Sequence, residues 1–250
     1  MRRFQVFSGF ALKWIAIVSM VIDHFGSIVL DGVLAPYWTD GQIAFTADMP
    51  LLIRSVPMMK TVCDALGSAA FPIFCFLLVE GFLHTHSRLQ YGLRMGLFAL
   101  ISELPFNLAH RQTLLYPGLQ NVLFTLCIGI FTLCAMAWAE KKLTGRKALL
   151  ALSLAGVILS GASVAYLIRS EYVFLGIFCI AALYLLRKNR WVQLLGFCPL
   201  LIASPWILLA LPPVAAYNGQ RGRGTKYFFY VFYPAHFLLF YGVARLLARR

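Results

Sequence analysis

Long apolar blocks separated by short polar connections dominate the chain. The blocks run over residues 12–34, 67–83, 91–109, 119–139, 148–168, 172–186, 191–217 and 227–247. A bilayer core about 30 Å thick takes about 20 apolar residues as a helix, so most blocks have the length of one membrane span. The block at 191–217 contains four prolines and predicts one broken span or two short ones. The pattern therefore predicts eight or nine transmembrane helices.

These blocks predict an all-α, polytopic transmembrane bundle that forms a single domain over residues 1–250. A β-barrel would show segments of roughly ten residues with alternating polarity instead. Hydrophobic residues make up 61% of the chain and charged residues 12%, against roughly 45–50% and about 25% in a soluble domain. Only the connection at residues 35–66 is long enough to be mobile or re-entrant, and it is too short for a soluble domain.

The charge is strongly basic, with 22 Lys+Arg against 9 Asp+Glu and a net charge of +13. High basicity raises nucleic acid as a partner, but here the basic residues lie in short connections between spans. That is the positive-inside pattern of a membrane protein, so we expect a bilayer and no nucleic acid. Arg2 and Arg3 before the first span predict a cytoplasmic N-terminus. The connection at 218–226 is also basic, which favours a 191–217 block that crosses twice or re-enters.

The strongest candidate site lies on the first helix. Ionisable side chains inside a span are costly and are functional candidates by default. Lys13 and His24 are eleven residues apart, which brings them to within about 20° of one helix face with a rise of roughly 16 Å. A cation at the rim and an imidazole deep on the same stripe suit coenzyme A, whose phosphates would bind at Lys13 while its thioester reaches inward. Lys13 as an interface lysine and His24 as a packing residue are the alternatives. Asp23, about 100° away, is expected to face a neighbouring helix.

Glu80 is the ionisable group of the second span. His84 lies one turn further along the same face, but Glu-x3-His without a third ligand is weak support for a metal, and none is predicted. We expect Glu80 to pair with Arg94 of the next helix or to orient His24.

A further polar set lies around the third and fourth spans. Glu103 and Asn107 share a helix face next to Pro105, and Glu103 is a second candidate for orienting His24. Gln120 and Asn121 open the fourth helix, where they would cap it or hydrogen-bond a polar acceptor. Together with Asp23 and Arg94, these amides form the predicted substrate-orienting set.

The third candidate region is the glycine-rich basic segment before the last span. Three glycines allow tight turns that expose backbone N–H groups, and a helix N-terminus follows. The predicted cofactor-binding set joins this segment to Lys13 and the last helix: Lys13, Asn218, Arg221, Arg223, Lys226 and His236. A basic glycine-rich loop is also an ordinary positive-inside loop, and that alternative stays open.

Four stretches carry a resemblance to a known family: LKWIAIVSMVIDHFG at 12–26, AFPIFCFLLVEGF at 70–82, LFALISELPFNL with QNVLFTL at 97–126, and YNGQRG with KYFFYVFYPAH at 217–236. In this order they resemble the TraX family of bacterial membrane proteins. That family is named for N-terminal acetylation of conjugative pilin and is grouped with transmembrane acyltransferases that use cytoplasmic acyl-CoA and a membrane histidine. Their basic residue, ten residues and a histidine are matched by Lys13 and His24. Many relatives have Arg where this chain has Lys13, so bidentate phosphate binding is lost there.

The resemblance and the residues together predict an acyl-CoA-dependent acyltransferase in the bacterial cytoplasmic membrane, with acetyl-CoA as co-substrate. The acceptor would be an amine or a hydroxyl, such as a protein N-terminus, a glycan or a lipid. His24 would act as general base or, alternatively, as a transient acyl carrier. A transporter or flippase is disfavoured because the charges crowd one half of the chain without internal symmetry. A noncatalytic assembly factor remains a third hypothesis.

Overall fold

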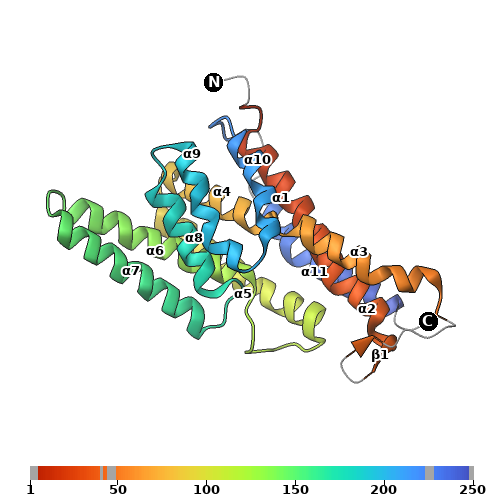
Figure 1. The fold of residues 1–250 in the computed structure, drawn as a ribbon. Coiled ribbons are helices and arrows are strands. Elements are labelled where there is room, and N and C mark those ends of the chain that lie inside the picture. The colour runs from red at the N-terminus through yellow and green to blue at the C-terminus, as the bar shows by residue number, and fades with distance from the viewer. Residues whose placement is uncertain (1–4, 40–41, 44–48, 223–227, 248–250) are drawn as a thin grey trace.

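The computed structural model describes residues 5–39, 42–43, 49–222 and 228–247. It is built almost entirely from helices, with one two-stranded hairpin at Trp38–Thr39 (β1) and Gln42–Ile43 (β2) (Figure 1). The long helices are α1 (Gly9–His24), α3 (Leu51–Gly67), α4 (Ala70–His84), α5 (Arg88–Arg111), α6 (Val122–Lys142), α7 (Lys147–Leu167), α8 (Val173–Leu185) and α11 (Phe228–Leu247). The prediction of an all-α bundle is confirmed.

Short helical segments complete the chain. A π-helix, η2 (Phe25–Leu30), follows α1 directly and continues into α2 (Asp31–Leu34) and a 3₁₀ turn at Ala35–Tyr37. After α8 come α9 (Arg190–Gln193), two 3₁₀ helices (Leu194–Ile202 and Pro205–Ala210) and α10 (Leu211–Ala215). Prolines and a serine cap at Ser204 divide this second group, because proline removes a backbone donor inside a helix.

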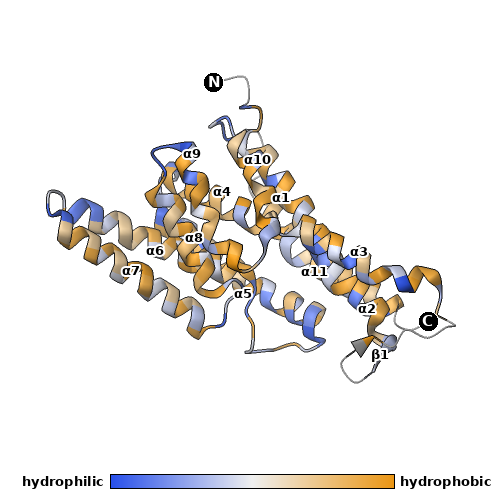
Figure 2. Cartoon of the chain, in the orientation of Figure 1, coloured by the Kyte–Doolittle hydropathy of each residue, from blue (hydrophilic) through white to orange (hydrophobic). Residues whose placement is uncertain are grey.

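Among the described residues, five helical stretches are long and apolar enough to cross a membrane: Gly9–Tyr37, Leu51–His84, Val122–Lys142, Lys147–Leu167 and Phe228–Leu247. Helix α5 is 24 residues long but carries several charges, and α8 is only 13 residues long, although both pack inside the bundle. Hydrophobic residues make up most of the length of these helices (Figure 2). The chain is therefore a helical membrane protein, and its span count of eight or nine stays a prediction.

The second half of the connection at residues 35–66, which is long enough for a mobile or re-entrant loop, is a regular helix. Leu51–Gly67 forms α3, a helix of 17 residues that runs through Pro57. One face of α3 packs against the end of the first helix, where Val56 and Ile53 contact Leu30 and Leu34. This apolar face is not evident in the sequence, because Arg54, Lys60 and Asp64 lower the mean hydropathy of the segment. The apolar face of the helix nevertheless continues past them.

The proline-rich block at 191–217 folds into a hairpin whose two ends meet. The Arg190 guanidinium lies 4.9 Å from the centre of the Tyr217 ring. Tyr217 in turn pairs with Phe7 at the start of the chain's described part. Because both ends of the block lie at the same place, this geometry favours two antiparallel segments over a single broken span.

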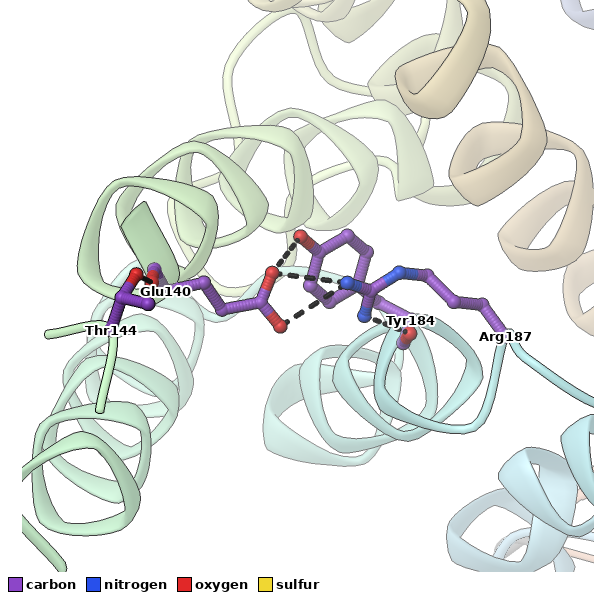
Figure 3. A network of polar contacts seen from close by, with 4 residues as sticks. All are labelled: Glu140, Thr144, Tyr184 and Arg187. Atoms are coloured by element: carbon purple, nitrogen blue, oxygen red, sulfur yellow. Dashed lines mark hydrogen bonds and ion pairs between the residues drawn. The ribbon is translucent and has the colours of Figure 1, made fainter. Parts of the chain in front are cut away.

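Several helix ends gather on the side that carries the start of α1, which we call the N-terminal face. There the end of α6 is hydrogen-bonded to the end of α8 (Figure 3). The Arg187 guanidinium donates to both oxygens of the Glu140 carboxylate, at 3.2 and 3.0 Å. The Tyr184 hydroxyl donates to the same carboxylate at 2.8 Å. The Arg187 guanidinium also lies 3.8 Å from the Tyr184 ring centre. This network clamps two helices that are otherwise joined by apolar packing.

Candidate functional site

His24 is the last residue of α1 and lies within the continuous helical stretch Gly9–Tyr37. Its side chain is buried, with 6% of its surface exposed. The π-helix that begins at Phe25 widens the backbone at this point, which rotates the following side chains relative to a regular α-helix. Such insertions often accompany functional positions in helices.

Lys13 and His24 both face α11, as their predicted common stripe requires. The Lys13 ammonium lies 5.4 Å from the centre of the Phe229 ring. Two turns further along α11, the Nε2 atom of His236 lies 2.7 Å from the Nδ1 atom of His24. The two helices therefore run side by side in the same direction, and one helix covers both members of the candidate site.

A third histidine, His110 near the end of α5, completes a cluster around His24. The ring centres of His110 and His24 are 5.9 Å apart, with the planes nearly perpendicular. The Nδ1 atom of His110 lies 3.2 Å from the Phe106 carbonyl, so this ring donates to its own helix. His110 was not among the predicted site residues because the third apolar block ends at residue 109. Extending the helical periodicity by one turn would have included it.

Asp23 faces a neighbouring helix, as predicted, and not the His24 ring. It packs where Gly67 ends α3, and a Cβ atom at Gly67 would come within 2.4 Å of the Asp23 Cβ. One turn earlier on α1, Ser19 donates to the carbonyls of Leu66 and Gly67, which are free because α3 ends there. This close approach fixes α1 against the break between α3 and α4.

Glu80 does not pair with Arg94 or His24; its ion-pair partner is Arg190, at 4.0 Å. The reason is the 191–217 hairpin, which brings Arg190 onto the Phe76 ring and over Tyr217. His84 donates from Nδ1 to the backbone carbonyl of Glu80 at 2.8 Å and so stays on its own helix. Glu80 thus belongs to the N-terminal face and not to the histidine cluster.

Glu103 binds Asn121 and does not reach His24. The Glu103 carboxylate accepts from the side chain of Asn121 at 2.7 Å and from its backbone N–H at 3.2 Å. Asn121 also caps α6 through Leu123 N–H and donates to the Ala99 carbonyl. The expectation that Asn121 caps the helix and binds a polar acceptor is confirmed, and the acceptor is Glu103.

The remaining predicted orienting residues are dispersed. Asn107 donates weakly to the Leu114 carbonyl at 3.5 Å, and Gln120 to the Tyr116 carbonyl at 3.5 Å. Arg94 lies near Tyr91 on the part of α5 closer to the N-terminal face. Among the described residues, the Arg94 Nε and Asn107 Oδ1 atoms are buried without a hydrogen-bond partner.

The segment 217–222 of the predicted cofactor-binding region lies against the start of α1. The Asn218 N–H donates to the Phe7 carbonyl, and the Gly9 N–H donates to the Gln220 carbonyl. The Asn218 side chain accepts from the Gln220 N–H at 2.9 Å, so its described role is to hold the turn. Gly219 and Gly222 have φ values of 78° and 73°, a region that glycine adopts readily.

Arg221 is brought close enough to Lys13 for their charges to interact, although 208 positions separate them in the sequence. Two cations so placed on one surface attract an anion with more than one charge. Arg223 and Lys226, the other two basic residues of the prediction, lie outside the residues that the structure describes.

A second polar group, missed in the sequence, lies beside the histidines. Tyr233 of α11 is 6% exposed, and its hydroxyl has no hydrogen-bond partner among the described residues. Its electrostatic neighbours include Glu103 and Glu171, the latter in the connection between α7 and α8. Burial and, next, the nearby Asp23 carboxylate raise the pKa of Glu171 to about 7. Glu171 was overlooked because it stands outside the apolar blocks.

Within the described ranges, no group of three or more His, Cys, Asp or Glu side chains is arranged to hold a metal ion. The histidine cluster has one imidazole deep in the helix bundle, with Lys13 on the same helix stripe and Arg221 close to Lys13. Such groups are suited to proton transfer near a bound anion.

The matches between this chain and known proteins extend along nearly its whole length. The chain is 27% identical to the "Probable fimbrial assembly protein FimC, serogroup H1" of Dichelobacter nodosus, over 93% of this chain and 94% of that protein. No solved structure matches the chain. The model of the TraX protein family matches residues 8–244, and the chain therefore belongs to the TraX family.

Proposed function

We propose that this protein is a membrane-embedded acyltransferase, which moves an acyl group from acyl-CoA to an amine or hydroxyl acceptor. The observation that carries the proposal is the stripe that joins Lys13 to His24 beneath α11. It combines a cationic rim, where Lys13 and Arg221 lie together, with a buried imidazole about 16 Å further along the helix. A long substrate with a polyanionic head and a reactive thioester tail has matching dimensions and charge.

The residues at the rim fit the phosphates of such a substrate. Lys13 and Arg221 supply positive charge, and the turn at Asn218–Gly222 is open and rich in glycine. Gly222 has its neighbouring side chains Ser8 and Phe10 within about 3 Å of where a Cβ would be, so the backbone of the turn lies directly on the start of α1. Arg221 is exposed and free to reach a ligand from this turn.

At the inner end of the stripe, His24 would act as the general base. It takes the proton from the acceptor N–H or O–H, the acceptor atom attacks the thioester carbonyl, and the carbon–sulfur bond breaks. The thiolate of CoA then takes a proton, so the products are the acylated acceptor and free CoA. For a neutral acceptor no proton is gained or lost overall.

The same proposal includes an orientation in the bacterial cytoplasmic membrane, with the N-terminal face in the cytoplasm. The described basic residues on the α6–α7 and α8–α9 connections support it: Lys141, Lys142, Arg146, Lys147, Arg187 and Lys188. Hydrophilic residues are also visible at these connections in Figure 2. Acyl-CoA would therefore reach Lys13 from the cytoplasm.

A noncatalytic role in assembly is the second candidate, because the relative from Dichelobacter nodosus is named a probable fimbrial assembly protein. An assembly factor needs no CoA site. Binding of acyl-CoA is therefore the property that separates the two candidates.

Thermal unfolding of the purified protein with acetyl-CoA tests the proposal. We expect acetyl-CoA to raise the unfolding temperature, because a ligand that binds only the folded state stabilises it. Lys13→Ala should weaken this effect, with an apparent affinity lower by roughly 10- to 100-fold for one charge-assisted contact. Lys188→Met is the matched control, since it removes an exposed charge from the same face. Absence of any stabilisation by acetyl-CoA would favour the assembly role.

A further inference from the structure

His24 and His236 meet edge to edge in the interior of the bundle. Their ring planes differ by only 13°, and the ring centres are 4.9 Å apart. The Nδ1 atom of His24 and the Nε2 atom of His236 are nevertheless 2.7 Å apart, closer than two stacked rings would allow. The hydrogen bond therefore lies close to both ring planes, where the N–H bond and the nitrogen lone pair point.

The other contact of His236 decides which nitrogen carries the proton. Its Nδ1 atom lies 3.2 Å from the Phe232 carbonyl, one turn earlier on α11. A carbonyl oxygen only accepts, so Nδ1 of His236 is the protonated nitrogen. In neutral His236 the Nε2 atom then carries the lone pair. His24 must donate from Nδ1, and the basic lone pair of His24 is left on Nε2.

The surrounding rings hold this arrangement. Phe237 contacts both imidazoles, with its ring centre 4.6 Å from that of His24 and 4.2 Å from that of His236. The Phe232 ring is parallel to His236 to within 8°. His24 and His236 are 6% and 4% exposed, so water competes little for the bond between them.

We propose that His236 is a positioning residue for His24: its Nε2 accepts the His24 Nδ1 proton and thereby keeps the His24 Nε2 lone pair available as the base. The inference rests on the proposed acyltransferase function. When His24 Nε2 takes the acceptor proton, the positive charge of the imidazolium strengthens the Nδ1–H···Nε2 bond to His236. The proton later passes from His24 Nε2 to the leaving thiolate, and His236 returns to its starting state.

This role differs from the one expected from the sequence, which grouped His236 with the cofactor-binding residues. It parallels the general rule that a base is oriented by the group bonded to its second nitrogen. The orienting group is usually a carboxylate or a carbonyl. Here the orienting group is a second imidazole, which accepts a hydrogen bond without placing a fixed negative charge next to the base.

Other titratable groups also face this pair and are relevant to any pH dependence. His110 approaches His24 edge-on from α5, and both His24 and His236 are within electrostatic range of it. Arg111 and Asp31 act on His110 in turn. From α1 itself, Asp23 faces Asp64 and Lys60 of α3. His110 is therefore the matched control, because its ring contacts His24 while its Nδ1 atom is bonded to the Phe106 carbonyl.

The first experiment measures the tautomers directly in the full-length protein, without reference to activity. The chain has five histidines, so ring-¹⁵N histidine labelling in lipid bilayers gives a small set of signals that single substitutions assign. We expect the neutral Nδ1–H form at His24, its loss in His236→Phe and its retention in His110→Phe. An Nε2–H form of His24 in the wild type would overturn the positioning role even if acyl transfer is found.

The second experiment follows the rate of acyl transfer against pH. His236→Phe keeps an aromatic ring but leaves the buried His24 donor unpaired, so the rate should fall roughly 10- to 100-fold and its acid limb should move to lower pH. His236→Gln offers an acceptor oxygen and should restore most of the rate and the wild-type acid limb. If His236→Phe keeps both the rate and the acid limb of the wild type, the inference is wrong. If the tautomers are as expected but the wild type transfers no acyl group, the proposed function fails and the inference about transfer fails with it, while the tautomer assignment stands.

Discussion

Single polar residues in the interior fall into two neighbouring sets with different surroundings. The first is the imidazole pair of His24 and His236, enclosed by phenylalanine rings. The second holds the carboxylates of Glu103 and Glu171 together with the Tyr233 hydroxyl. Glu103 accepts hydrogen bonds from Asn121, whereas Glu171 lies near another acid, Asp23. A charge on Glu171 therefore costs folding free energy, and its protonation relieves that cost.

Glu171 gives a pH-dependent stability with a defined sign. Because its pKa is raised to about 7 in the folded protein, the folded state keeps a proton that the unfolded chain releases near pH 4.5. The free energy of unfolding should be highest below that pH, fall as the pH rises through 7 and then level off. Glu171→Gln should remove this fall and be more stable than the wild type at pH 8.5 by on the order of 2 kcal/mol.

Thermal unfolding of both proteins between pH 4 and pH 9 measures this difference. Curves for the wild type and Glu171→Gln that stay parallel over the whole range would show that Glu171 is not held in a neutral form by its surroundings.

The sequence predicts residue relations within one helix much better than relations between helices. Lys13 and His24 were placed on one stripe because helical periodicity alone sets their angle, and the structure agrees. The partner of His24 was not predictable in this way. His236 is 212 positions away, and only the packing of α1 on α11 decides that it, and not Glu80 or Glu103, reaches the imidazole.

Helices in this protein are joined at points where small residues allow their backbones to approach. The break between α3 and α4 is one such point, since Ser19 and Asp23 of α1 occupy the space beside Gly67. Another is Gly176 of α8, where Thr125 and Phe71 lie within 3 Å of a Cβ position. The sequence pattern predicted most helices, and the basic connection at 218–226 favoured the return of the 191–217 block. The pattern could not show α3, because its charges conceal its packed face.

Gly67→Ala tests the close approach of α1 to the α3–α4 break. The new Cβ would come within 2.7 Å of three atoms of Asp23, including its Cβ, so α1 must shift. We expect a loss of about 1–3 kcal/mol in the free energy of unfolding, as for other overpacked sites. Gly156→Ala on α7 is the control, because nothing lies within 4 Å of its Cβ position, and it should be neutral or stabilising by up to about 1 kcal/mol.

Thermal unfolding in the same detergent compares the two variants. If Gly67→Ala unfolds at the temperature of Gly156→Ala, Gly67 is not a point of close helix contact.

The whole molecule has one face that gathers positive charge and an opposite side where the start of α3, the end of α5 and the α7–α8 connection lie. Among described residues, the second side carries compensated charges such as Asp31 with Lys60. Positive charge is retained on the cytoplasmic side of membrane proteins. This asymmetry supports the proposed orientation, in which acyl-CoA and the acceptor would reach His24 by different routes.

Labelling of single cysteines from one side of the membrane tests this orientation. In a Cys198→Ser background, which removes the exposed native cysteine, we expect Leu115→Cys to react with an impermeant maleimide in intact spheroplasts. Thr144→Cys and Gln220→Cys should react only after permeabilisation, because both lie on the N-terminal face. Labelling of Thr144→Cys from outside would invert the orientation. Opposite labelling of Thr144→Cys and Gln220→Cys would contradict the hairpin at 191–217.

Transfer of a radiolabelled acetyl group from acetyl-CoA in isolated membranes tests the central claim most directly. The wild type should label an acceptor, and His24→Ala should lose this labelling by at least about 100-fold, the contribution of a general base, while it keeps the wild-type amount of folded protein. His84→Ala, which alters a histidine bonded to the Glu80 carbonyl away from the cluster, serves as the control. Undiminished labelling by folded His24→Ala, or no labelled acceptor with the wild type, would contradict the account.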